Sequence, residues 1–442
     1  MSGPVVLCWL RRDLRLHDHA ALYHALRHAR QHGARVQPLF IFDTDILQAL
    51  PSRCDRRVDF IQQALCHLDG QLAAQGAGLR VCIGAPLAVF GQLLAEPAQV
   101  IAVFTSHDYE PAALARDLSV QRLLAGQGAA WHSVKDQVIF EKNEVLKDDG
   151  TPYTVFTPYS KKWRSRLSDF YLQSYPSEKY TAHLAARAEA GEGGIPTLAD
   201  MGFQATGIRF APPAVSPGLL RRYAEQRDIP GIEGTSRLGI HLRFGTGSVR
   251  ALARQAQTLS DAFLNELIWR DFFQMLLWHY PHSVDQSFKP DYDAMAWRNV
   301  PEEFDRWKSG TTGYPLVDAG MRELHATGFM HNRVRMSTAS FLCKHLLIDW
   351  RWGERYFAEQ LLDYDQAANV GNWQWAAGSG ADAAPYFRIF NPHLQAQKFD
   401  PEQRYIRQWV PEFGTPAYPP PMVEHALARQ RCLAVYQQAL KS

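Results

Sequence analysis

A thirty-residue segment that begins at Asp363 concentrates side chains able to hold a flat, partly polar ligand. Asp365 follows two residues later and Asn369 four residues after that, so two carboxylates and an amide lie close together in the chain. Seven alanines and three glycines in this segment let the backbone approach a ligand closely. Trp373 and Trp375 add broad apolar rings, each with one polar N–H. An aromatic-rich turn between packed helices would have a similar composition, so the pattern leaves both a ligand site and ordinary packing open.

The helical pattern at 259–279 places Glu266, Trp269, Arg270 and Phe273 on one face, because these residues recur at three- and four-residue intervals. By itself this spacing favours a plain helix with a Glu–Arg ion pair and two aromatic core residues.

Two shorter motifs suit an anion site and a substrate contact. Thr235 and Ser236 precede a helical pattern at 238–244, and hydroxyls and unpaired backbone N–H groups at a helix N-terminus can bind an anion. An ordinary helix cap would look the same. Asn332 and Met336 are one helical turn apart, so both can face one pocket.

The elements that must position these residues are of two kinds. Over the first 130 residues, short runs rich in Val, Ile and Leu alternate with helical patterns, which predicts a parallel sheet with right-handed crossovers. The predicted strands are 5–10, 36–42, 79–83 and 100–105, and the predicted helices are 20–31, 55–74 and 87–95. No GxGxxG motif follows the first strand, so the usual dinucleotide fingerprint is absent.

The second half of the chain has a helical period. Residues 131–205 are rich in turn residues and predict a long connection with some helix. From residue 206 helical patterns dominate, most strongly at 259–279, 337–350 and 354–364, and nine of the twelve tryptophans lie in this half. We therefore expect an α/β domain with a doubly wound, Rossmann-like parallel sheet, followed by an all-α domain better suited to a cofactor.

Composition limits the function without defining it. With 46% hydrophobic and 21% charged residues, the chain has the balance of a soluble globular protein. Its net charge of +2 means that any nucleic-acid surface must be a local basic patch. The six cysteines show no CxxC pair and no metal-like spacing with histidine, so no metal site is expected. The charged N-terminus and the lack of an 18-residue apolar run predict a cytoplasmic protein with no membrane partner.

These motifs resemble those of the DNA photolyase/cryptochrome family, and most of all those of its class I cyclobutane pyrimidine dimer (CPD) photolyases. The resemblance covers nearly the whole chain and includes the opening WLRRDLRLHDHAAL, where His19 stands in place of a frequent Asn. It implies an antenna-binding α/β domain at 1–130, an inter-domain linker at 131–205 and a helical FAD-binding domain at 206–442. One FAD, bound non-covalently, is the implied cofactor.

The resemblance also implies roles for individual residues, each named by its position in this chain. Residues expected to bind FAD are Tyr223, Thr235, Ser236, Arg237, Leu238, Gly239, Arg335, Asp363, Tyr364, Asp365 and Asn369. Residues expected to contact DNA or its lesion are Arg227, Glu266, Trp269, Arg270, Phe273, Asn332, Arg333, Trp375 and Gln395. The expected catalytic residues are Glu266, Asn332, Met336 and Asn369, and the expected electron donors are Trp297, Trp350 and Trp373, from the surface inward. Gly239 departs from the family's TSxLS motif, which has a hydroxyl there.

The implied function is light-driven repair of CPDs, in which an electron passes from reduced FAD to a lesion flipped out of the DNA. CPD photolyases carry Asn and Met where Asn332 and Met336 stand, whereas (6-4) photolyases carry histidines at those places. A cryptochrome-type blue-light photoreceptor with the same fold is the alternative. Damaged DNA is the expected partner, and the expected form is a monomer.

An antenna chromophore is a further expectation for the N-terminal domain. In folate-binding members a Tyr-Glu pair is followed by Asn-Glu, but the stretch YEPAA at 109–113 replaces both of those side chains with alanine. A deazaflavin, or no antenna, is therefore expected rather than a folate. The acids and bases expected around the chromophore are Arg57, Asp108, Glu110 and Arg243. Asp108 and Glu110 would also suit the start of an ordinary helix.

Overall fold

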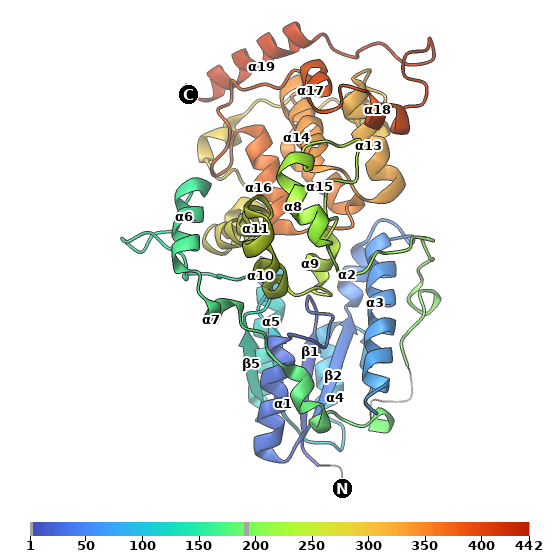
Figure 1. Cartoon of the computed structure of the whole chain (residues 1–442), viewed down its shortest axis with the longest axis vertical. Coiled ribbons are helices and arrows are strands. Elements are labelled where there is room, and N and C mark those ends of the chain that lie inside the picture. Colours follow the sequence, from blue (N-terminus) through green and yellow to red (C-terminus); the bar gives the residue numbers. More distant parts are fainter. Residues whose placement is uncertain (1–2, 190–193, 442) are drawn as a thin grey trace. The chain divides into compact units, whose positions relative to one another are not determined.

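The computed structural model describes residues 3–189 and 194–441, and the described chain forms two compact units (Figure 1). Unit one comprises Met1–Glu141, Leu167–Ala214 and Leu238–Gln255, and unit two comprises Lys142–Arg166, Val215–Arg237 and Ala256–Ser442. Neither unit is one continuous stretch of chain. The segment expected to be a linker contributes to both units.

Unit one is built on a parallel sheet with the strand order β3-β2-β1-β4-β5. Its strands are β1 (Val5–Leu10), β2 (Arg35–Phe42), β3 (Arg80–Ile83), β4 (Val100–Ser106) and β5 (Ala130–Val134). The chain moves outward from β1 to β3 and then returns past β1 to β4 and β5, so the sheet is doubly wound, as predicted. The four predicted strands are all present, each within one residue of its expected ends.

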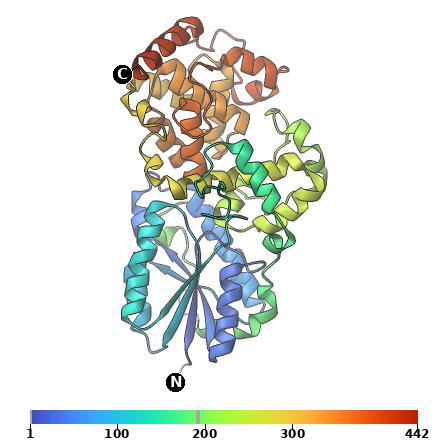
Figure 2. The same cartoon turned by 90° about the vertical axis from the view of Figure 1, so that its left-hand side faces the viewer.

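Helices cover both faces of this sheet (Figure 2). The helices of unit one are α1 (Ala20–His32), α2 (Thr44–Ala49), α3 (Arg56–Ala73), α4 (Pro86–Leu94), α5 (Pro111–Gly126), α7 (Asp169–Leu172) and α9 (Gly239–Phe244), and α10 (Val249–Leu259) runs across the division between the units. Helix α5 was not predicted, because it buries only Ala113, Val120 and Leu124 and so lacks a sustained apolar stripe.

A buried ion network joins distant parts of unit one. Asp136 accepts hydrogen bonds from Arg15 Nη2 (2.6 Å), Arg250 Nη2 (2.8 Å) and the Ala20 backbone N–H (3.2 Å). Asp18 accepts from Arg250 Nε (2.9 Å). Burial by itself would raise the pKa of Asp136, but the two guanidinium groups outweigh burial and hold that pKa well below its ordinary value. The network therefore fixes three stretches of chain that are far apart in sequence.

Unit two is helical. Its helices are α6 (Phe156–Arg166), α8 (Pro217–Gln226), α11 (Asp261–His279), α12 (Pro301–Ser309), α13 (Pro315–Thr327), α14 (Asn332–Ser340), α15 (Trp350–Gln360), α16 (Gln366–Ala377), α17 (Pro392–Phe399), α18 (Arg404–Trp409) and α19 (His425–Ala439). Proline opens α12, α13 and α17, where its fixed φ suits the first helical position. The core around α13 to α16 includes Trp307, Phe341 and Trp373, all buried. Among the described helices, none has both the length and the apolar composition needed to cross a membrane.

The helix predicted at 337–350 does not run to its expected end. Helix α14 continues into a π-helix (Phe341–Leu346), and Leu347 then adopts the left-handed φ of 53°. Asp349 caps the next helix by accepting from the Arg351 N–H (3.0 Å), so α15 starts at Trp350. The apolar run across this break is buried throughout, and no periodicity marks where the helix ends.

Replacing Asp136 with Asn should destabilise unit one, because Arg15 and Arg250 would remain buried without their shared carboxylate. Removing one partner of a buried ion pair commonly costs about 3–5 kcal/mol. Because the folded-state pKa of Asp136 is depressed, its contribution is fully present above the unfolded-state pKa of about 3.9 and is lost as the pH falls through the folded-state pKa. Urea unfolding of wild type and variant should therefore give a free-energy difference that is constant near neutral pH and shrinks below about pH 4.

Asp169→Asn is the matched control, because Asp169 is an exposed aspartate of the same unit. It should leave the unfolding midpoint close to that of the wild type. If the loss in unfolding free energy caused by Asp136→Asn does not change with pH, the assignment of a charged Asp136 to this network is contradicted.

Candidate functional site

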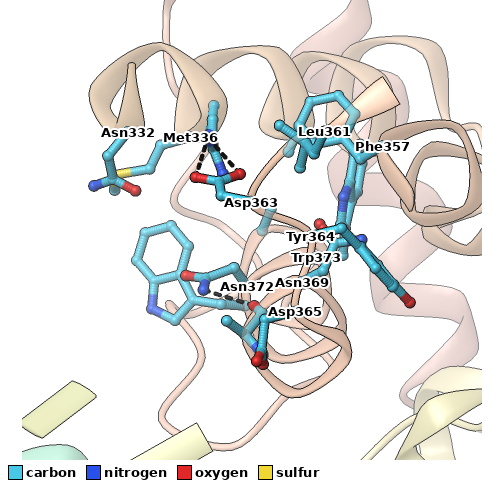
Figure 3. A pocket seen from close by; sticks show the side chains of 15 residues that line it. Asn332, Met336, Phe357, Leu361, Asp363, Tyr364, Asp365, Asn369, Asn372 and Trp373 are labelled. Atoms are coloured by element: carbon cyan, nitrogen blue, oxygen red, sulfur yellow. Dashed lines mark hydrogen bonds and ion pairs between the residues drawn. The ribbon is translucent and has the colours of Figure 1, made fainter. Parts of the chain in front are cut away.

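One pocket in unit two is lined by five of the eleven residues predicted to bind FAD (Figure 3). It lies between α14, α15 and α16 and has a cavity volume of about 100 Å³. Its lining residues are Asn332, Arg335, Met336, Ala339, Phe357, Leu361, Asp363, Tyr364, Asp365, Ala368, Asn369, Asn372, Trp373, Trp375 and Ala376. Two motifs that are some thirty residues apart in sequence therefore meet around one space.

The N-terminus of α16 is fixed by Asp365. The Asp365 carboxylate accepts from the Ala368 backbone N–H (3.3 Å), as a helix cap does, and from Gln274 Nε2 of α11 (2.9 and 3.0 Å). Helices α11 and α16 approach closely, because a Cβ on Gly371 would lie 2.3 Å from the Phe273 ring. Glycine at this position therefore lets α11 set the position of α16.

Asn369 is oriented by Glu354 of α15. Its Nδ2 donates to the Glu354 backbone carbonyl (3.2 Å) and to Glu354 Oε1 (2.9 Å), which uses both amide hydrogens. A carbonyl oxygen can only accept, so the amide nitrogen must face Glu354, and Oδ1 is the atom that can accept from a donor in the pocket. Burial raises the pKa of Glu354, and Tyr364 Oη donates to the same carboxylate (3.4 Å).

A fixed positive group lies on the pocket lining beside Asp363. Arg335 Nη2 donates to both Asp363 oxygens (3.1 and 2.9 Å), and Arg335 Nε donates to the Met330 carbonyl (2.7 Å). The guanidinium groups of Arg335 and Arg237 lie 5.7 and 4.7 Å from the centre of the Phe329 ring. These contacts hold Arg335 in place, so its charge can favour an anionic group in the pocket.

Helix α14 supplies the predicted substrate contacts. His331 caps this helix by accepting from the Arg333 backbone N–H (3.2 Å), which starts α14 at Asn332. Asn332 and Met336 therefore lie one turn apart, and both line the pocket together with Trp375. Burial lowers the pKa of His331 to about 4, so this histidine is neutral near pH 7 and serves as a cap.

The predicted contact residues of α11 do not line this pocket. Glu266 forms an ion pair with Arg227 at the end of α8. Burial raises the pKa of Glu266, although Arg227 acts in the opposite direction. Trp269 and Arg270 are partly exposed, and Phe273 is buried against α16.

Two further residues predicted to contact DNA lie on α14 and α17, outside the pocket lining. Arg333 Nη2 donates to Asp228 (2.7 Å), and its guanidinium lies 4.5 Å from the centre of the Phe399 ring. Gln395 on α17 is partly exposed. The roles of these residues in DNA binding stay predictions.

The three predicted electron donors differ in burial. Trp373 lines the pocket and is 2% exposed, Trp350 is 1% exposed, and Trp297 is partly exposed. A Cβ on Gly353 would lie 2.2 Å from the Trp373 ring, so α15 holds that ring tightly. Trp297 makes an edge contact with Tyr436, with ring centres 6.2 Å apart.

The predicted phosphate-binding segment is divided between the units. Thr235, Ser236 and Arg237 belong to unit two, whereas Leu238 and Gly239 belong to unit one, where α9 begins at Gly239. Neither hydroxyl residue caps α9, whose cap position is taken by Leu238. Their contacts with phosphate stay predictions.

Tyr223, also predicted at the phosphates, lies on α8 near that segment. It is buried and makes an edge contact with Phe263, with ring centres 5.2 Å apart. A Cβ on Gly234 would lie 2.6 Å from the carbonyl oxygen of Gln226, so the turn before Thr235 packs directly on the end of α8.

A second polar cluster lies in unit one, beyond the carboxyl ends of β1 and β4. Arg12 Nη1 donates to Asp108 (3.3 Å) and Glu110 (3.2 Å), and Arg243 forms an ion pair with Glu110. Burial by itself would raise the pKa of Asp108, but Arg12 and neighbouring guanidinium groups hold it below its ordinary value. Three predicted antenna residues thus meet where the strand order reverses, the usual ligand position of such sheets. Arg57 instead pairs with the carboxylate that caps α3.

Sequence reasoning missed three residues that shape unit two. Gln274 lies one helical turn beyond Arg270, so extending the polar face of α11 would have found it. Glu354 lies within a predicted helix, but nothing in the sequence pairs it with Asn369. Phe156, from the expected linker, stacks on Trp269, and no local signal indicates this contact.

Comparison with known proteins matches both units to one family. Residues 263–417 match the FAD-binding domain of DNA photolyase, and residues 6–179 match DNA photolyase. The deoxyribodipyrimidine photo-lyase of Escherichia coli is 37% identical over 98% of this chain and 99% of its own length. That of Alkalihalophilus pseudofirmus is 36% identical over 99% of this chain and 98% of its own length.

Solved structures give the same result. A class III photolyase from Agrobacterium tumefaciens matches with a TM-score of 0.85 at 32% identity, covering 100% of this chain and 98% of its own. A photolyase from Sulfolobus tokodaii that contains two FAD molecules matches with a TM-score of 0.85 at 31% identity, covering 98% of this chain and 100% of its own. A Synechocystis cryptochrome matches with a TM-score of 0.83 at 27% identity, covering 98% of this chain and 99% of its own.

The pocket residues suit a flavin ring. Phe357, Leu361 and Trp373 supply apolar surface, while Asn369 Oδ1 and the Asp363 carboxylate supply acceptors for the polar edge of the ring. The matched FAD-binding domain contains every one of these residues. The chain therefore belongs to the DNA photolyase/cryptochrome family and is a flavin-dependent enzyme of DNA repair.

Proposed function

We propose that this enzyme repairs cyclobutane pyrimidine dimers in DNA under blue light. The observation that carries the proposal is that Asn332 and Met336 line the same pocket as Asp363 and Asn369. The residues expected to meet the dimer therefore border the space expected to hold the flavin. Bound in its reduced form, FAD would supply the electron for splitting the dimer when it absorbs light. Relatives named deoxyribodipyrimidine photo-lyase, matched over nearly their whole length, support this substrate.

The chain's own residues support this reaction by position and charge. Asn369 keeps Oδ1 available because Glu354 takes both amide hydrogens. The Arg335 guanidinium, fixed by its pair with Asp363, is the positive group that would favour a reduced, anionic ring. The Glu266 carboxyl can form a hydrogen bond with the edge of a pyrimidine base.

A blue-light photoreceptor is the second candidate function. The similarity to a Synechocystis cryptochrome, at 27% identity and a TM-score of 0.83, supports it. Repair remains the preferred proposal because Asn332, Met336 and Trp375 together retain the pattern expected of a CPD photolyase. Light-dependent chemistry on a dimer separates the two functions.

Purified protein with reduced flavin should remove the dimer from an oligonucleotide that carries one thymine dimer, in blue light and not in the dark. Glu266→Ala should slow this repair by about 10²–10³-fold, as expected when a hydrogen bond to developing charge is lost. FAD content and melting temperature should stay near wild type, because Arg227 is 34% exposed and water can replace its partner. Chromatography of the irradiated oligonucleotide measures the repair.

The matched control is Glu225→Ala, because Glu225 is an exposed glutamate on α8. Its repair rate should equal that of the wild type. No light-dependent loss of the dimer in the wild type would overturn the proposed function and favour the photoreceptor. Loss of flavin or of folding in Glu266→Ala would instead show that the Glu266–Arg227 pair is structural.

Trp373→Phe should abolish light-driven reduction of oxidised flavin but leave repair by pre-reduced enzyme close to wild type. The smaller ring keeps an aromatic face in the site while removing the donor expected nearest the flavin. The flavin absorbance under blue light, with an external reductant present, measures the first effect, and the dimer assay measures the second. The control is Trp409→Phe, a partly buried tryptophan of the same core. Unchanged photoreduction in Trp373→Phe would mean that another residue donates the electron.

We also propose that unit one binds a deazaflavin rather than a folate. The ion cluster of Arg12, Asp108, Glu110 and Arg243 at the switch point of the sheet supports a site for a polar, ribityl-bearing ring. The protein should therefore retain added deazaflavin after desalting and should lose added methenyl-folate. A parallel sample with excess FAD tests whether a second flavin is accepted instead, as in the Sulfolobus tokodaii structure. Stoichiometric retention of the folate would refute the proposal, and Glu110→Ala should weaken whichever chromophore binds.

A further inference from the structure

Helix α6 presents Phe156 to the indole ring of Trp269. The two ring centres are 3.6 Å apart, and the ring planes differ by 3°, so the rings lie face to face. Phe156 is 8% exposed, whereas Trp269 is partly exposed. Phe273 also packs against Trp269, with ring centres 5.5 Å apart and planes 26° apart, and part of the Trp269 ring stays exposed.

Further contacts hold α6 along α11 (Figure 1). Trp163 Nε1 donates to Asp271 Oδ2 (2.9 Å), and Asp271 is 1% exposed. Arg164 Nη2 donates to Asn265 Oδ1 (3.0 Å). These two bonds lie further along the same face of α6 as Phe156, since the spacing of seven and eight residues corresponds to two helical turns. The position of Phe156 is thus set by the docking of a whole helix.

The start of α6 is held as well. The Phe156 backbone N–H donates to Asp382 Oδ2 (3.2 Å), and burial raises the pKa of Asp382. Phe272 makes edge contacts with both stacked rings, at 5.8 Å from Phe156 and 5.6 Å from Trp269. Two isolated aromatic rings prefer offset or edge-to-face arrangements over a full sandwich. The surrounding contacts therefore hold the two rings in the parallel geometry.

We propose that Phe156 is a positioning residue, which holds the Trp269 ring flat so that a base of the dimer can stack on it. The inference rests on the proposed function, because it assigns Trp269 to the lesion. A ring that is already fixed loses little freedom when a base stacks on it, so rigidity raises affinity without a direct contact. Phe156 contributes to binding the lesion, and the light-driven step in the bound complex does not depend on it.

Phe156→Leu should weaken dark binding to a dimer-containing oligonucleotide by about threefold to tenfold, the size expected for one aromatic pair. Fluorescence anisotropy measures this affinity. Binding to undamaged DNA, FAD content and the repair rate at saturating substrate should stay near wild type. Phe156→Tyr, which keeps the ring, should restore the affinity. Phe170→Leu serves as the control, because Phe170 is 72% exposed and lies in unit one.

A double-variant cycle shows whether Phe156 acts through Trp269. In a Trp269→Leu background, Phe156→Leu should cause no further loss of lesion affinity, because the ring that it positions is gone. Phe156→Met keeps most of the side-chain volume but has no ring face, so its lesion affinity should match that of Phe156→Leu. A difference between the two variants would indicate a folding defect in one of them.

The outcomes separate this inference from the proposed function. If Trp269→Leu weakens lesion binding while Phe156→Leu and Phe156→Met do not, the inference is overturned and the function stands. Equal losses from Phe156→Leu in the presence and absence of Trp269 would also overturn it, because Phe156 would then act by another route. If the wild type shows no preference for the dimer and no repair, the proposed function itself has failed.

Discussion

Helix α16 is anchored by buried polar bonds at its start, its middle and its end, and the shape of the pocket between α14, α15 and α16 follows from that anchoring. Asp365 bonds to α11, Asn369 bonds to α15, and the Ala377 carbonyl accepts from Lys344 Nζ (2.7 Å) and Tyr436 Oη (2.8 Å). Leaving one buried group unsatisfied costs about 1–3 kcal/mol. A one-residue shift of the helix would break all three anchors at once. These bonds therefore fix the register of α16. They also fix the direction in which each of its pocket side chains points.

Anchoring of this kind also explains the break between α14 and α15. The π-helix ends at Leu346 and is followed by Leu347, whose left-handed backbone is unfavourable for a leucine. The same π-helix carries Lys344, which is 2% exposed and whose pKa burial lowers to about 8. The carbonyl of Ala377 lies at the end of α16, where a positive group is favourable. An irregular turn thus carries a buried amine that satisfies the end of the helix lining the pocket.

Much of this arrangement could be predicted from the sequence, and the rest could not, for physical reasons. Buried strands appear in the sequence as short apolar runs, so the bounds of β1 to β4 could be predicted to within one residue. The roles expected of pocket residues such as Asn332 and Met336 came from the family resemblance, and only their one-turn spacing came from the sequence pattern itself. Long-range partners carry no such local signal: the bond from Asn369 to Glu354 and the stacking of Phe156 on Trp269 depend on which helices meet. The end of the π-helix was missed because a fully buried run has no amphipathic period.

Charge pairing around α11 and α14 involves residues that are predicted to contact DNA. Arg227 is paired with Glu266, and Arg333 is paired with Asp228, so two of the three arginines predicted to contact DNA or its lesion have carboxylate partners. With a net charge of only +2, the chain depends on such local groups for attraction to DNA. Partly exposed ion pairs of this kind contribute about 0–1 kcal/mol to the stability of the fold. Replacing the carboxylate partner of such an arginine with a DNA phosphate would therefore cost little. Engagement of Arg227 by a phosphate would at the same time release Glu266, and binding of the DNA backbone would thereby free the carboxyl that is expected to meet the base.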